Sequence, residues 1–397
     1  MTEEEIVKKR KKAEKIRKSR KRQLKRMTFL AVEIVIFLLL AGITFVMAKY
    51  DKFQTVYFGE DDIQTNPGIK MEGYMTVALF GGDSREGLLE EGTHADTIIL
   101  ASINNDTKDV RLVSIYRDTL TEQMDDKIKK ANYAYFKGGP KDAINMLNKN
   151  FDLNIENYVT VDFKAVSDVI DLLGGIEVDV TDAEAAEMNN YIGETAASVG
   201  KEAKLITKGG KQHLDGVQAV TYARIRKNVG GDYKRTERQR IVISKVVEKA
   251  KKMKLSTVNK IINKVFSQIS TNFSLPDMIS LASGAFGYNL GDTTSFPFES
   301  ISRNVSGVGS SIIPVGFVEN VQELHQFLYP DQKIKEPSEK IHEIADRIES
   351  MTGITRENLE TEVQNVVQNE REKNEEEKAA EEQTEDVENK EVDKQSK

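Results

Sequence analysis

The chain has 397 residues, a formal net charge of −7 at pH 7 and no cysteine. The lack of cysteine excludes a disulfide framework, a cysteine nucleophile and thiolate metal sites. The chain has only 4 histidines and no HExxH motif, which argues against a histidine-based zinc site.

The N-terminal part combines a basic tail with an apolar run. Residues 1–27 carry 13 Lys or Arg against 4 Glu, and residues 28–48 contain one charged side chain, Glu33. A helix over that run spans about 31 Å, the thickness of a bilayer's hydrocarbon core. By the positive-inside rule we predict a cytoplasmic basic tail at 1–26, a single transmembrane helix at 27–49 and an extracellular remainder.

The basic tail alone would also suit a nucleic-acid-binding arm. Because the tail directly precedes a predicted membrane helix, the simpler interpretation is that it sets the membrane topology and contacts anionic lipids.

After a polar linker at 50–74, strand-like and helix-like patterns alternate. β-Branched runs predict strands at 75–81, 96–104, 110–116, 158–163 and 176–180. Helical spacing appears at 141–151, at 164–175, where a pair of glycines ends the pattern, and through most of 240–290. Residues 295–317 return to strand and turn. This alternation predicts an α/β domain over 75–330, with a central sheet layered by helices on both faces (α/β/α).

The composition changes after Pro330. Two amphipathic patterns predict a helical accessory segment at 331–369. Residues 370–397 carry 12 acidic against 6 basic side chains and no aromatic residue, so we predict a disordered acidic tail.

Two polar clusters follow predicted strands. In "FGGDSREG" (80–87) a strand leads into Asp83 and Arg85, without the GK[ST] ending of a Walker A loop. In "HADTIIL" and "SIYRDT", Asp96 opens one strand, and Arg117 with Asp118 closes the next. If these two strands pair as neighbours, Asp96, Arg117 and Asp118 would lie at one edge of the sheet, beside a ligand crevice.

The third cluster is "AVTYARIRKNVGGDYKRTERQR" (219–240), which contains five arginines. If its first part is a strand, Arg224 and Arg226 share one face. The "VGG" that follows predicts a turn.

If a helix starts near "DYKRTERQR", Asp232 is a plausible N-cap, and Arg235, Arg238 and Gln239 lie on one face. The segment would then form an arginine cradle at a helix N-terminus, where anions are favoured.

These clusters suggest phosphoryl transfer. Asp83 and Asp96 offer the oxygen ligands that Mg²⁺ prefers, and arginines can hold a diphosphate through paired hydrogen bonds. A solvated basic face explains the third cluster equally well on its own. Nucleic acid is a weaker alternative, because no RNA-binding aromatics interleave with the arginines and the predicted topology places the domain outside the cell.

The sequence "SVGK" (198–201) matches the S-x-x-K of penicillin-binding enzymes. That pattern is frequent by chance, and neither S-D-N nor K-T-G accompanies it.

The ordered motifs, from "FGGDSR" and "ADTIILASIN" through "VRLVSIYRDT" to "LDGVQAVTYARIR" and "GDYKRTERQR", resemble the LytR-CpsA-Psr family of Gram-positive envelope proteins. The resemblance covers about 75–245 and extends to the basic tail and membrane helix. It implies an α/β/α fold with a hydrophobic pocket for a polyprenyl chain. It also implies Mg²⁺-dependent transfer of an anionic glycopolymer, such as teichoic acid or capsule, from undecaprenyl diphosphate to a peptidoglycan hydroxyl.

The resemblance also assigns residues. It implies metal-binding carboxylates at Asp83 and Asp96. The diphosphate-binding positions that it implies are Arg117, Arg224, Arg226, Arg235 and Gln239, with Arg85 and Arg238 at further motif positions. Many members carry a basic residue before the "DT" motif, where this chain has His94 and Ala95.

The resulting hypothesis is a membrane-anchored phosphotransferase whose catalytic residues are Asp83, Asp96 and Arg117. Its expected partners are the lipid-linked glycopolymer, peptidoglycan and membrane lipids, without nucleic acid. The alternatives are a transcriptional regulator or attenuator of envelope genes and a lipid-diphosphate-binding protein without turnover.

Overall fold

The computed structural model describes residues 47–361, except 49, 53, 57, 60, 70, 83–88, 90, 91, 285, 286 and 360. The basic tail, nearly all of the predicted membrane helix and the acidic tail therefore lie outside the described residues. Within the described part, no helix has the length and apolarity needed to cross a membrane. The chain divides into two units, residues 1–53 and 54–397, and the fold below is that of the second.

A mixed sheet of seven strands forms the centre of this unit, in the order β1-β10-β7-β2-β3-β4-β11. The strands are β1 (Gln54–Thr55), β2 (Tyr74–Gly82), β3 (Ala95–Asn104), β4 (Asp109–Ile115), β7 (Asn157–Asp162), β10 (Ile269–Thr271) and β11 (Asn289–Phe296). β3 runs antiparallel to both β2 and β4, whereas β2 pairs in parallel with β7, and β4 with β11. This sheet, flanked by helices, confirms the predicted α/β fold class.

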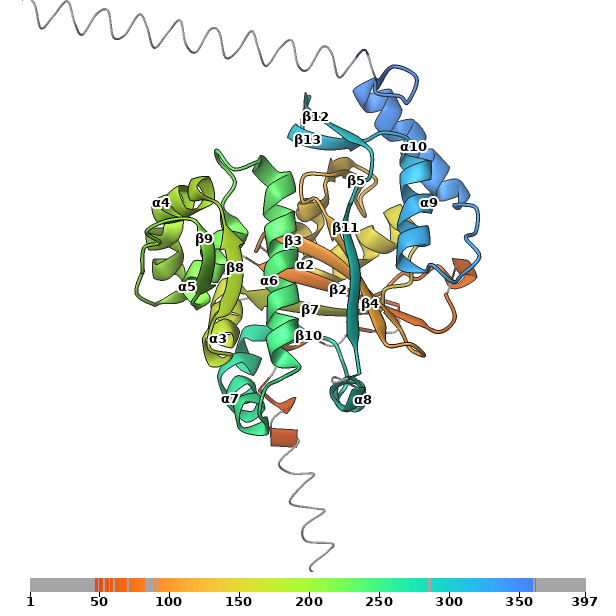
Figure 1. Cartoon of the computed structure of the whole chain (residues 1–397). Helices are drawn as coiled ribbons and strands as arrows, with labels where there is room; N and C mark the ends of the chain where they lie inside the picture. The colour runs from red at the N-terminus through yellow and green to blue at the C-terminus, as the bar shows by residue number, and fades with distance from the viewer. Residues whose placement is uncertain are drawn as a thin grey trace, which may run out of the picture. The chain divides into compact units, whose positions relative to one another are not determined.

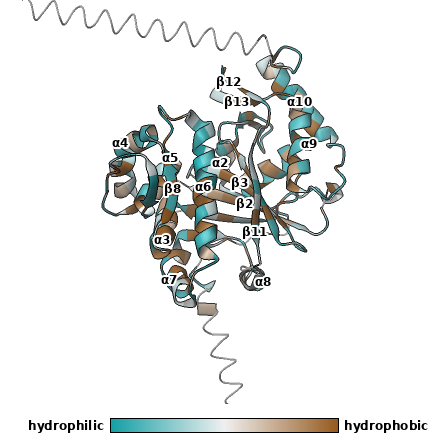
Figure 2. Cartoon of the chain, viewed as in Figure 1, coloured by the Kyte–Doolittle hydropathy of each residue, from teal (hydrophilic) through white to brown (hydrophobic). Residues whose placement is uncertain are grey.

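Alternating side chains of the strands enter two separate apolar clusters, because successive residues of a strand point to opposite faces. On β3, Ile98 and Leu100 belong to the larger cluster, while Ile99 and Ala101 belong to the other. Figure 2 shows hydrophobic residues concentrated in these central strands, behind a largely hydrophilic α6 (Gly231–Ala250).

Three helices contribute to the larger cluster: α2 (Ala131–Phe151), α9 (Phe317–Leu328) and α10 (Glu339–Thr352). The stretch before β2 also packs on this body, since β1 pairs with β10 and the Phe58 ring lies 5.7 Å from that of Tyr158. The segments on either side of the predicted catalytic region therefore contribute to its packing.

The opposite face of the sheet is crossed by α6 (Figure 1). On one flank of α6 lies a second layer made of α3 (Phe163–Leu172), α4 (Asp182–Val199), α5 (Gly216–Arg224) and the hairpin of β8 (Ile176–Val180) and β9 (Gly210–Leu214). β11 lies on the other flank. α3 ends before Gly174 and Gly175, both with φ of 78°, as the glycine pair predicts.

The remaining elements surround this frame. They are β5 (Leu120–Glu122), β6 (Ile128–Lys130), α7 (Leu255–Val265), α8 (Leu275–Gly284), β12 (Ser300–Val305), β13 (Gly309–Pro314) and the short 3₁₀ turns η1 (Pro67–Ile69) and η2 (Phe266–Gln268). The Ile312 amide donates to the carbonyl oxygen of Asp118 at 2.9 Å. The β12–β13 hairpin thereby lies beside the segment that follows β4.

Candidate functional site

The antiparallel pairing of β3 and β4 brings Asp96 and Arg117 together. Asp96 is the second residue of β3, and Arg117 follows the end of β4. Arg117 Nη1 donates to Asp96 Oδ1 at 2.5 Å, and Arg117 Nε lies 3.6 Å from Asp118 Oδ2. Burial opposes the charge of Arg117, but the carboxylates of Asp96 and Asp118 outweigh it and raise the pKa of this guanidinium.

The segment at 219–226 is not a strand, and this expectation was wrong. Asp215 and Gln218 form a capping box that starts α5, and the helix continues to Arg224. The chain becomes extended at Ile225, with φ −61° and ψ 142°, so Arg224 and Arg226 do not share a strand face.

The turn before α6 forms as predicted, but its cap differs. Asn228 and Gly230 have φ of 57° and 89°, in the left-handed region that glycine and asparagine tolerate best. Gly230 is the N-cap of α6, and Asp232 lies in the first turn of the helix. A carboxylate there is still favoured by the partial positive charge of a helix N-terminus.

A cavity of about 320 Å³ lies where these elements meet. Its lining residues are Asp96, Phe163, Tyr191, Glu194, Arg224, Ile225, Arg226, Lys227, Arg235 and Gln239. The structure thus gathers five of the predicted site residues from three separate segments. It combines them with apolar side chains, which is the composition of a typical small-molecule site.

Arg224 and Arg226 are held at the cavity in different ways. Arg224 donates to Thr195 Oγ1 at 3.0 Å and to Glu194 Oε1 at 3.2 Å, and its guanidinium lies 4.7 Å from the Phe163 ring centroid. Arg226 Nη1 lies 3.9 Å from Asp232 Oδ1, and 41% of its side chain is exposed. Arg224 is therefore preorganised, while Arg226 is partly exposed.

Arg235 is the most deeply buried cation of the site, with 2% of its surface exposed. Its Nη2 donates to the Asp96 carbonyl oxygen at 3.2 Å and lies 2.9 Å from Asp232 Oδ1. Burial lowers the pKa of Arg235 to about 10. Among the described residues, Arg235 Nε has no hydrogen-bond partner, and neither does Gln239 Oε1. A buried arginine beside a cavity favours an anionic ligand, because hydrogen bonds from a guanidinium to an anion are charge-assisted.

Arg238 does not line the cavity. It is buried, and it donates to Glu184 Oε1 at 2.7 Å and to the carbonyl oxygens of Ile225 and Val229 at 3.1 and 2.5 Å. Arg238 was expected to contact the substrate, but its guanidinium bonds to the protein instead. These bonds fix both ends of the loop that carries Arg226 and Lys227.

Asp83 and Arg85 lie outside the described residues. The strand before them ends at Gly82, whose partner on β3 is Ala95, next to Asp96. Within the described ranges, no three His, Cys, Asp or Glu side chains group closely enough to hold a metal. Among the described residues, Asp96 and Glu194 offer hard carboxylate oxygens at the cavity wall. One or two such carboxylates suit Mg²⁺, because this ion keeps several waters and binds substrate phosphates as well.

Several residues of the cavity were not expected from the sequence. Phe163 begins α3, Lys227 lies in the loop, and Tyr191 and Glu194 lie three positions apart on α4. Helical spacing marks the shared face of Tyr191 and Glu194, but not what that face contacts.

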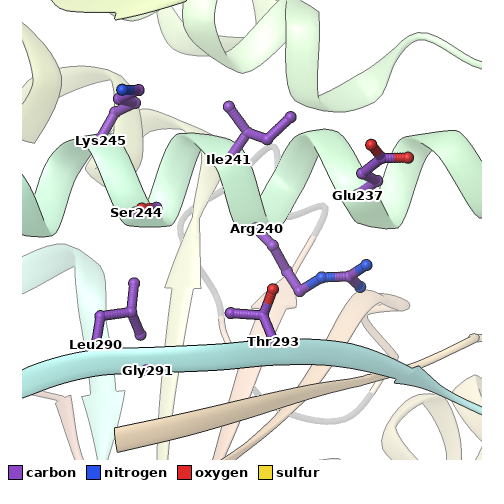
Figure 3. A pocket seen from close by; sticks show the side chains of 8 residues that line it. All are labelled: Glu237, Arg240, Ile241, Ser244, Lys245, Leu290, Gly291 and Thr293. Carbon is purple, nitrogen blue, oxygen red and sulfur yellow. The ribbon is translucent and has the colours of Figure 1, made fainter.

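A second hollow, of about 520 Å³, lies on the other flank of α6. Figure 3 shows the Arg240 side chain crossing from α6 toward β11, close to Thr293. Arg240 Nη1 donates to Ser295 Oγ at 2.7 Å.

Comparison with known proteins places this site in context. The chain is 26% identical over 239 residues to the polyisoprenyl-teichoic acid–peptidoglycan teichoic acid transferase TagV of Bacillus subtilis (strain 168), covering 59% of each chain. It is 33% identical over 214 residues to the transferase of the same kind, TagU, of Bacillus licheniformis, covering 53% of this chain and 63% of that one. The matches thus span about three-fifths of these relatives' own length.

The fold also matches solved structures. The crystal structure of B. subtilis TagT aligns with 70% of this chain and 99% of its own, with a TM-score of 0.54 and 23% sequence identity. The LytR_cpsA_psr family model matches residues 44–312, which is more than half of the chain and includes every predicted site residue. This protein therefore belongs to the LytR_cpsA_psr family.

Proposed function

We propose that the protein is a membrane-anchored phosphotransferase that moves an anionic glycopolymer from a polyprenyl-diphosphate carrier to a peptidoglycan hydroxyl. The observation that carries the proposal is the cavity in which Arg224, Arg226 and Arg235 converge beside Asp96. Two related proteins are named teichoic acid transferases, which supports a polymer of that class. A solvated basic face would not enclose a cavity that is also lined by apolar side chains.

In this reaction the acceptor hydroxyl oxygen forms a bond to the phosphorus that carries the polymer. The bond from that phosphorus to the bridging oxygen breaks, and polyprenyl phosphate leaves. The hydroxyl proton passes to a site carboxylate, and Asp83 or Asp96 can accept it only if the two are not both fully committed to the metal.

The protein's contribution is positioning and charge stabilisation. Arg224 and Arg235 are preorganised by Glu194 and Asp232 and would hold phosphate oxygens without reorganising. Arg117 pairs with Asp96, and in this proposal it stabilises the charge that develops on the transferred phosphoryl group. A Mg²⁺ bound by Asp96 and Asp83 would neutralise further phosphate charge.

The proposed location follows from the N-terminal sequence. A basic tail before an apolar run supports a single-pass anchor with the cavity outside the cell. In intact protoplasts, added protease should digest the domain after residue 50 and spare the tail. A protected domain would contradict this topology.

The direct test is a transfer assay with the full chain in detergent. The wild-type protein should transfer a labelled saccharide phosphate from a synthetic polyprenyl diphosphate to peptidoglycan. It should also bind polyprenyl diphosphate more tightly than the monophosphate, because the second phosphate meets the additional arginines. Binding without transfer would identify a lipid-binding protein instead, and absence of both would refute the proposal.

A further inference from the structure

Tyr233 is an exposed aromatic side chain at the start of α6, next to the site's Asp232. Of its surface, 43% is accessible, although large apolar side chains are usually covered. Its ring makes an edge-to-face contact with Tyr116, at 4.8 Å between centroids. Its hydroxyl oxygen lies 3.3 Å from Ser302 Oγ on β12. The ring is therefore held in place and still presents a surface to solvent.

Tyr116 contacts the Tyr233 ring and lies next to Arg117 in the chain. It is buried and immediately precedes Arg117, which pairs with Asp96. The exposed ring of Tyr233 thus lies one side chain away from the segment that carries Arg117. Such a rigid ring gives contact area at little entropic cost, and the neighbouring serines add hydrogen-bonding groups.

Tyr233 also begins a face of α6 that differs from the face at the cavity. Tyr233, Glu237, Arg240 and Ser244 follow helical spacing along one side, which reaches the 520 Å³ hollow against β11. Of that hollow's eight lining residues, five are charged or carry a hydroxyl: Glu237, Arg240, Ser244, Lys245 and Thr293. A groove with this lining suits a hydroxyl-rich ligand and is poorly matched to a lipid chain.

The two flanks of α6 also fit the geometry of phosphoryl transfer. The attacking and leaving oxygens lie roughly in line on opposite sides of the phosphorus. The cavity with Phe163, Tyr191 and Ile225 lies on the α5 side of α6, and the groove lies on the β11 side. Tyr233 begins the α6 face that borders this groove and contacts β12. With the carrier lipid's phosphate in the cavity, an acceptor approaches from the side of Tyr233.

We infer that Tyr233 and the groove between α6 and β11 form the subsite for the acceptor saccharide, with a sugar ring on Tyr233 and its continuation toward Lys245. This inference rests on the proposed transferase function and adds the location of the acceptor. Tyr233 is then a binding residue that sets the acceptor's approach to the phosphorus.

The test varies the acceptor concentration in the transfer assay with the full chain. Tyr233→Ala should raise the KM for soluble peptidoglycan glycan about 10-fold and leave kcat and the affinity for polyprenyl diphosphate within about 2-fold. Tyr233→Phe keeps the ring and should behave as wild type, and Tyr233→Leu should behave as the alanine variant. Met351→Ala, which truncates an exposed side chain on α10, is the matched control and should change nothing.

Three results would overturn the subsite: an unchanged KM in Tyr233→Ala, an equal loss of lipid-diphosphate binding, or a phenylalanine variant as impaired as the alanine variant. Direct titration of the wild type with a soluble glycan fragment separates this inference from the proposed function. Glycan binding that Tyr233→Ala abolishes supports the subsite even if the wild type transfers no polymer. No binding of the fragment by the wild type contradicts it.

Discussion

The cavity beside Asp96 and the ion cluster around Asp168 both collect basic side chains on carboxylates, but only the first is open to a ligand. Asp168 is fully buried, and its oxygens lie 2.8 to 3.0 Å from the ammonium groups of Lys164, Lys201 and Lys264. These lysines tie α3 to the ends of α4 and α7. None of them lines the described cavity beside Asp96.

Net charge does not separate the two regions. Around Asp168, three lysines face the carboxylates of Asp168 and Asp171. At the cavity, the described cations Arg117, Arg224, Arg226, Lys227 and Arg235 face the carboxylates of Asp96, Asp118, Glu194 and Asp232. Each region has one cation in excess. The difference is that the arginines border an empty volume, whereas the lysines converge on one carboxylate.

The largest effect should come from Asp96→Asn. The substitution removes the charge that pairs with Arg117 and the hard ligand proposed for Mg²⁺, with little change in volume. Transfer should fall on the order of 1000-fold while Tm stays within a few degrees. The matched variant Asp168→Asn should keep most of the activity. If both variants transfer normally, or if a chelator has no effect on the wild type, the proposed role of Asp96 is wrong.

Conservative changes of the arginines should have the next largest effect. Arg224→Lys and Arg226→Lys keep the charge and lose the paired hydrogen bonds, so each should slow transfer by about 10- to 100-fold and lower Tm less than Arg238→Lys does. Transfer rates measured at saturating acceptor test this. Wild-type rates in both variants would mean that the cluster is only a charged face.

Arg238→Lys provides the contrast within the same helix. Because Arg238 bonds to two loop carbonyls and Glu184, its replacement should cost about 1–2 kcal/mol of stability, visible as a lower Tm. An unchanged Tm would contradict the anchoring role that we assign to it.

Glu122 tests a third region, in which cations surround a carboxylate that is fully buried. Lys149 and Lys340 lie 2.8 and 2.9 Å from Glu122 Oε1, and Arg347 contacts Oε2, so the cluster ties α10 to β5. Glu122→Gln should lower the free energy of unfolding by about 2 kcal/mol. Breaking a fully buried ion pair would cost more, but here water can rehydrate Lys340 and Arg347. Glu343→Gln removes an exposed carboxylate from the same Lys340 and should cost under about 0.5 kcal/mol. Equal urea midpoints for the two variants would contradict this ranking.

The smallest expected effect is a pH dependence at Asp168. Burial alone would raise the pKa of Asp168, but hydrogen bonds from Lys201, Lys164 and Lys264 lower it well below the usual 3.8. A carboxyl group whose pKa is lowered by folding stabilises the folded protein at pH values above its unfolded-state pKa. This stabilisation is lost as the pH falls below the unfolded-state pKa and through the folded-state pKa. Between pH 4 and 2 the free energy of unfolding of the wild type should fall by on the order of 1 kcal/mol more than that of Asp168→Asn, as measured by urea unfolding. Parallel pH curves would contradict this.

The sequence by itself predicted the α/β class, because the β-branched run at 96–104 and the glycine pair after α3 are local signals. It also predicted the helix that carries Arg235, and the convergence of Asp96 with Arg117 follows from pairing two neighbouring strands. At 219–226 the sequence was misread: the capping box of Asp215 and Gln218 was a local signal for α5 that the strand-like residues obscured.

The tertiary structure decided the roles within the arginine cluster. Arg235 and Arg238 lie three positions apart on α6, so helical spacing placed both on one face. Packing against the 225–229 loop then gave Arg238 carbonyl partners, while Arg235 faces the cavity between α4, α5 and β3. Periodicity fixes only the direction of a side chain about its own helix axis. What the side chain meets there depends on elements from distant parts of the chain, and these meet only in the folded domain.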